Sequence, residues 1–183
     1  MKPERIVMKT LQTKTQASWF LSLTFLLLLS SSGYTQSSTE PLLNRFNGTW
    51  RGEGKAFGRT ARLDMTWERV LDNRFVRLSL RNEMQSANGQ KQVFEGHAYY
   101  QPVGAPSDGK YEARWFDSRG VSFHIKAQTE GDTLVSFWGS PETEQGKSVY
   151  QVIGTDKMEV VDSVRQKDGT WREFGKFIVQ RQQ

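Results

Sequence analysis

The stretch TARLDMTWERVLDNRFVRLSLRNEM, residues 60–84, decides the fold class. Apolar residues occupy every second position in its first half: Ala61, Leu63, Met65 and Trp67. Its second half repeats the pattern with Val76, Leu78 and Leu80. A period of two predicts strands that bury one face and expose the other. The intervening LDNR, residues 71–74, is rich in turn-forming residues, so the two strands are predicted to pair as an antiparallel hairpin.

The same alternation recurs through the rest of the chain and is interrupted by turn sequences such as Asn88-Gly89. It predicts strands at residues 48–57, 60–70, 75–84, 91–101, 110–117, 121–129, 133–139, 147–153, 158–165 and 171–181. Short, evenly spaced strands joined by hairpin turns indicate a sandwich or a barrel. We predict an all-β fold with a single antiparallel up-and-down barrel of about ten strands, because closure removes the exposed sheet edges.

Residues 1–36 differ from this pattern. Four basic residues come first, then an apolar run from Trp19 to Leu29, then small residues near residue 33. That order is typical of a secretory signal peptide, here with cleavage near residues 33–36. The apolar run is about half the length that a membrane-spanning helix needs. The chain has no Cys to carry a lipid. We therefore expect a periplasmic or secreted protein with no stable membrane anchor after cleavage.

Removal of the predicted signal peptide would lower the net charge of the protein. The chain has a net charge of +5, from 25 basic and 20 acidic residues. Residues 1–36 contribute four basic residues and one acid, which leaves 21 − 19 = +2 for the rest. No basic cluster remains, so nucleic-acid binding is not expected. Residues 37–47 are expected to be a lead-in with a short helical turn, and residues 48–183 to form the barrel domain. The oligomeric state stays open.

Four segments resemble a bacterial family of unknown function with a lipocalin-like barrel: GTWRGEG (48–54), MTWERVLDNRFVRL (65–78), FEGHAYYQP (94–102) and KYEARWFDSRG (110–120). More distantly, the chain is similar to fatty-acid-binding proteins and nitrobindin, which with the lipocalins are called calycins. The resemblance implies that Trp50 packs against Arg181 at the base of the barrel. It implies a fold, and no settled activity.

The strands carry most of the aromatic residues. A ten-stranded barrel is wider than the eight-stranded one that side chains just fill. We therefore expect a lumen that binds a small hydrophobic or amphipathic molecule. The aromatic candidates for its lining are Trp67, Tyr99, Trp115, Trp138 and Tyr150. The candidate polar anchors are Arg77, Glu95, His97 and Asp117.

Two alternatives compete with simple binding. A nitrobindin-like heme protein would use a histidine, and His97 is the candidate, because His124 lies on the polar face of its strand. The resemblance places the heme ligand near the C-terminal end, where KFIVQRQ has no histidine. No cofactor is therefore predicted. The second alternative is an isomerase or hydrolase that pairs His97 with Glu95 or Asp117 in the lumen.

Other chemistry has less support in the sequence. Two separated histidines and no Cys do not supply the three protein ligands of a catalytic zinc site, so no metal is predicted. A Ser-His-Asp triad stays open, although no nucleophile-elbow sequence is present. No catalytic residue is assigned. Glu142 and Glu144 are interpreted as solvated loop charges.

Overall fold

A computed structural model describes residues 42–86 and 88–183. The predicted signal peptide, residues 1–36, and the first part of the lead-in lie outside the described residues. Within the described ranges, no helix is long and apolar enough to cross a membrane.

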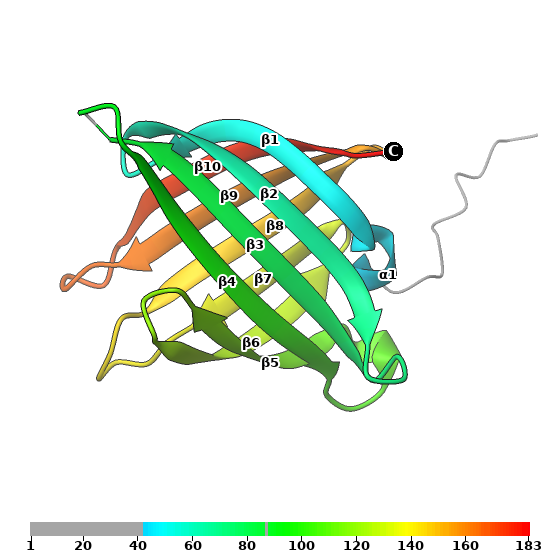
Figure 1. The fold of residues 1–183 in the computed structure, drawn as a ribbon. Coiled ribbons are helices and arrows are strands. Elements are labelled where there is room, and N and C mark those ends of the chain that lie inside the picture. The colour runs from blue at the N-terminus through cyan, green and yellow to red at the C-terminus, as the bar shows by residue number, and fades with distance from the viewer. Residues whose placement is uncertain (1–41, 87) are drawn as a thin grey trace, which may run out of the picture. The chain divides into compact units, whose positions relative to one another are not determined.

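The described chain is a closed barrel of ten antiparallel strands preceded by one short helix (Figure 1). Around the barrel the strand order is β1-β10-β9-β8-β7-β6-β5-β4-β3-β2, so chain neighbours pair and β1 closes on β10. The elements are α1 (Leu42–Phe46), β1 (Gly48–Ala56), β2 (Arg59–Val70), β3 (Phe75–Gln85), β4 (Lys91–Pro102), the 3-10 helix η1 (Pro106–Asp108), β5 (Lys110–Asp117), β6 (Ser122–Glu130), β7 (Thr133–Trp138), β8 (Gly146–Ile153), β9 (Lys157–Arg165) and β10 (Trp171–Arg181).

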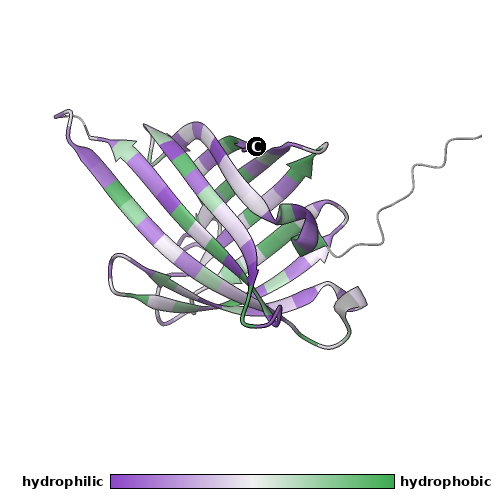
Figure 2. Ribbon diagram, turned by 45° about the vertical axis from the view of Figure 1, so that its right-hand side comes forward, coloured by the Kyte–Doolittle hydropathy of each residue, from purple (hydrophilic) through white to green (hydrophobic). Residues whose placement is uncertain are grey.

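The fold predicted from the sequence is confirmed. Every predicted strand bound lies within one residue of the observed bound. Hydrophobic and hydrophilic bands alternate along the strands (Figure 2), as expected when one face of each strand lines the interior. The largest fully buried side chains include Trp50, Trp67, Tyr100 and Phe177.

The two ends of the barrel differ. One end carries α1 and the turns after β2, β4, β6 and β8, and we call it the plugged end. The other carries the turns after β1, β3, β5, β7 and β9, at the left in Figure 1, and we call it the open end. At the plugged end Phe46 is fully buried, with its ring centroid 5.0 Å from that of Trp67 and 6.3 Å from that of Tyr150.

Arg181 joins the last strand to the segment around α1. Its guanidinium carbon lies 4.2 Å from the centroid of the Trp50 ring, which is opposite Arg181 in the β1–β10 register. The guanidinium also donates hydrogen bonds to the carbonyl oxygens of Asn47 and, at 2.6 Å, Arg45. The indole of Trp50 donates to the carbonyl oxygen of Phe46 at 2.7 Å. These contacts fasten α1 across the plugged end, so the interior is accessible from the open end.

Candidate functional site

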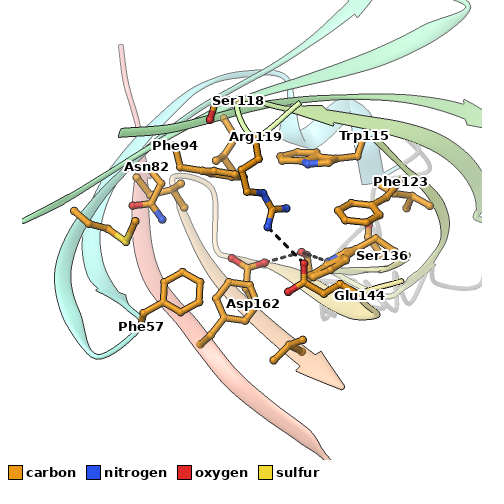
Figure 3. A pocket seen from close by; sticks show the side chains of 18 of the residues that line it. Phe57, Asn82, Phe94, Trp115, Ser118, Arg119, Phe123, Ser136, Glu144 and Asp162 are labelled. Atoms are coloured by element: carbon orange, nitrogen blue, oxygen red, sulfur yellow. Dashed lines mark hydrogen bonds and ion pairs between the residues drawn. The ribbon is translucent and has the colours of Figure 1, made fainter. Parts of the chain in front are cut away.

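The barrel encloses a cavity of about 580 Å³ between the plugged end and the open end (Figure 3). Its apolar lining comes from strands all around the barrel and includes Leu63, Leu80, Phe94, Trp115, Phe123, Ile125, Trp138 and Phe174. Residues of the open-end turns form its rim, and Phe57 there is 58% exposed. The lumen is therefore a cup with one mouth.

Two tryptophans lie against the barrel wall over glycines of neighbouring strands. A Cβ atom on Gly96 would lie 2.1 Å from the Trp115 ring, and one on Gly146 would lie 1.8 Å from the Trp138 ring. Each indole N–H has a partner: Trp115 donates to Asp117 at 2.8 Å and Trp138 donates to Ser148 Oγ at 3.3 Å. The missing side chains let both rings pack close to the wall, which keeps the centre of the lumen open.

A row of small polar residues crosses three adjacent strands on the cavity wall. Ser136 on β7 pairs with Ser148 on β8, and Ser148 pairs with Asp162 on β9. We call these three residues the polar shelf. Ser148 Oγ donates to Asp162 Oδ1 at 2.6 Å, and Ser136 Oγ shares a hydrogen bond with the Tyr100 hydroxyl at 3.0 Å. The shelf places three polar side chains of the cavity wall side by side on adjacent strands.

Burial changes the pKa values of Asp162 on the polar shelf and of two neighbouring tyrosines. Burial raises the pKa of Asp162 from 3.8 to about 6, and the hydrogen bond from Ser148 opposes that rise only in part. Burial also raises the pKa values of Tyr100 and Tyr150. Both phenols therefore stay neutral at physiological pH, and Asp162 is the titratable group of the inner cavity in that range.

Arg119 dominates the rim. Its guanidinium donates to both carboxylate oxygens of Asp117, at 3.2 Å and 2.9 Å. It also lies 3.5 Å from a carboxylate oxygen of Glu144 (Figure 3). It also stacks near the rings of Phe94 and Phe123, at 5.5 Å and 6.0 Å. Burial acts to raise the pKa of Asp117, but the bonds from Arg119 and Trp115 outweigh it and lower that pKa. One cation is thus shared by two carboxylates.

Five of the predicted lumen residues face the interior. Trp115, Trp138 and Tyr150 line the cavity, and Trp67 is fully buried beneath it against Phe46. The Asp117 side chain is fully buried behind Arg119. Their contact with a ligand stays a prediction.

Four residues predicted to face the lumen lie on the outer face instead, and that prediction was wrong for Arg77, Glu95, His97 and Tyr99. Arg77 pairs with Glu68 at 2.5 Å, His97 bonds Ser79 at 3.0 Å and Glu95 pairs with Arg81 at 3.4 Å. Tyr99 lies opposite Arg77 in the β3–β4 register. The inward positions of β4 belong to Phe94, Gly96, Ala98 and Tyr100. A glycine is needed at position 96 because the Trp115 indole occupies the space that a side chain would fill.

The outward position of His97 and Glu95 bears on the heme hypothesis and on the enzyme hypothesis. Both histidines of the chain lie outside the lumen: His97 on β4, and His124, whose ring is 3.9 Å from Glu112 on the neighbouring strand. The heme hypothesis loses its candidate ligand, and the enzyme hypothesis loses its His97–Glu95 pair. In the described ranges no group of three His, Asp or Glu residues converges as a metal site does.

The polar shelf, Arg119 and the rim position of Glu144 were not predicted from the sequence. A signal for Asp162 was present: it interrupts the inward apolar series Met158, Val160 and Val164. Ser136 and Ser148 likewise interrupt the apolar faces of β7 and β8. Glu144 is not merely a solvated loop charge, since it pairs with Arg119 at the cavity mouth.

Two solved structures have a fold similar to that of this chain. Rv2717c from M. tuberculosis is 15% identical, with a TM-score of 0.59 over 79% of this chain and 99% of that one. The S-type phycobiliprotein lyase CPES from Guillardia theta is 9% identical, with a TM-score of 0.54 over 77% of this chain and 90% of that one. No family model matches the chain, and a search of the curated proteins found no match. At these identities the likeness shows a shared β-barrel fold.

Proposed function

We propose that this protein is an exported barrel that binds a small hydrophobic or amphipathic molecule in its lumen. The observation that carries the proposal is the one-mouthed cavity of about 580 Å³, with an aromatic lining and a few fixed polar groups. Binding sites for small molecules are concave, mainly apolar and of about 300–1,000 Å³. Export is inferred from the signal-peptide pattern of residues 1–36.

The details of the lining support binding over plain core packing. Protein interiors are normally close-packed, and leaving apolar volume unfilled costs stability. Here two indoles are held against the wall by glycines and by hydrogen bonds, which keeps volume free that larger or reoriented side chains would fill. An unfilled lumen of this kind is expected in a protein that binds a ligand there.

The fold comparison adds modest support. A protein named a phycobiliprotein lyase shares the barrel architecture, so a barrel of this kind is compatible with a role in handling another molecule. The kinship to lipocalins and fatty-acid-binding proteins, inferred from segments such as GTWRGEG, remains part of this proposal.

Uptake of the neutral fluorescent probe N-phenyl-1-naphthylamine tests the proposal. We expect saturable binding to the purified protein and at least a tenfold loss in Leu80→Trp, since the larger ring fills the cavity that Leu80 lines. The matched control is Ile178→Trp, at a position 39% exposed on the outer face of β10, which should bind like wild type. Circular dichroism verifies that both variants fold. Equal binding by Leu80→Trp, or no saturable binding by the wild type, would contradict lumen binding.

A further inference from the structure

We propose that the ligand presents a hydrogen-bond donor, an amine or a hydroxyl, to Asp162 on the polar shelf, so that the lumen prefers donor-headed apolar molecules to carboxylates. This inference rests on the proposed function and names the ligand class of the same site.

Asp162 has unused acceptor capacity on the cavity wall. Ser148 donates to Oδ1 at 2.6 Å, and no residue in the described part of the chain donates to Oδ2. An ionised carboxylate has about four acceptor positions. A buried carboxylate is costly unless it is paired and hydrogen-bonded. A ligand amine or hydroxyl beside Asp162 would supply the missing donor.

The neighbouring shelf residue cannot serve a carboxylate ligand. Ser148 has one hydroxyl proton, which it gives to Asp162, and its oxygen accepts the Trp138 N–H. A ligand that reaches Ser148 and Asp162 therefore meets acceptor oxygens. The Tyr100–Ser136 pair retains one hydroxyl proton, and a single neutral donor does not offset the desolvation of a ligand carboxylate.

The cation at the rim does not reverse this preference. Arg119 is already bound to Asp117 and Glu144, so the three groups together carry one excess negative charge. Arg172 also lines the mouth, but it is exposed, where solvent screens its charge. A carboxylate held by Arg172 would leave its apolar tail against Asp162, which remains unpaired. A ligand ammonium group beside Asp162 would pair with that carboxylate and would not depend on the exposed Arg172.

Three probes with the same chain separate the head groups: dodecylamine, dodecanol and dodecanoate, each titrated below its aggregation concentration by calorimetry at pH 7.5. We expect dodecylamine to bind at least about tenfold more tightly than dodecanoate, with dodecanol between them, since an unpaired buried charge is strongly unfavourable. Asp162→Asn should abolish the preference for the amine. Glu159 lies on the same strand as Asp162 and pairs on the outer face with Lys176 of β10, so Glu159→Gln should leave the preference intact.

The pH dependence gives a second readout. Wild-type protein should bind dodecylamine several-fold more weakly at pH 5 than at pH 7.5, because Asp162 becomes protonated while the amine stays charged. The titratable side chains beside Asp162 are Tyr100 and Tyr150, which are neutral at both values. Asp162→Asn, or Asp162→Ser if the amide does not fold, should show no such change.

The outcomes separate the two proposals. Equal binding of dodecylamine and dodecanoate, or a preference that survives at Asp162→Asn, would overturn the donor inference and leave lumen binding standing. Failure of all three probes to bind wild-type protein would instead contradict the proposed function.

Discussion

Asp162 is the residue that gives the lumen its polarity. It sits among inward-facing apolar residues of β9, and among the described residues only Ser148 donates a hydrogen bond to it. The sequence could have indicated it, because an acid in an apolar series is a departure from the strand pattern. Its pairing with Ser148 and Ser136 could not be predicted, since that depends on the register of three strands.

The raised pKa of Asp162 predicts how stability varies with pH. The folded state holds the proton up to about pH 6, whereas the ordinary value is 3.8, so stability falls as pH rises through that window. Asp162→Asn removes the penalty and should be more stable than wild type by about 3 kcal/mol at pH 7.5, with little difference near pH 4. Urea unfolding at both pH values measures this. A variant that is less stable by the same amount at both would refute the assignment.

At the scale of elements, β4 and β5 show why the inward face of β4 was assigned wrongly for Glu95, His97 and Tyr99. Both faces of residues 93–100 carry an aromatic residue and small or polar neighbours, so the alternation on that strand is ambiguous. The decision comes from β5, whose Trp115 needs the space above Gly96. The face of β4 that points into the lumen is therefore decided by the packing of β4 against β5. The sequence pattern of β4 alone does not carry that information.

Gly96→Ala tests this pairing. The added Cβ would lie 2.1 Å from the Trp115 ring, so the indole must move into the lumen. We expect a loss of about 1–3 kcal/mol in unfolding free energy, a change in tryptophan fluorescence and weaker uptake of N-phenyl-1-naphthylamine. Gly154→Ala is the control: its φ of +69° strains a side chain, but nothing lies within 4 Å. Gly154→Ala should lose stability but keep normal uptake of the probe. Unchanged uptake by Gly96→Ala would contradict the claim that Gly96 holds the Trp115 ring out of the lumen.

At the scale of the whole molecule, the fold was predictable and the site only partly so. Period-two alternation and turn residues are local signals, and ten such strands close into a barrel because open edges are unfavourable. Trp115, Trp138 and Tyr150 could be placed inside by parity alone. The rim cluster around Arg119 could not, because it joins the β5–β6 turn to the β7–β8 loop, which are distant in sequence.

The barrel as a whole is a cup closed by α1 at one end, and its central claim is that a small amphipathic molecule occupies it. The indole N–H resonances of ¹⁵N-labelled protein test this directly during a titration with dodecylamine. We predict saturable shifts for Trp115 and Trp138, which line the cavity, and none for Trp171, which is 40% exposed and lies beside the ring of Phe137. Shifts confined to Trp171, or no saturable shift at Trp115 and Trp138, would contradict it.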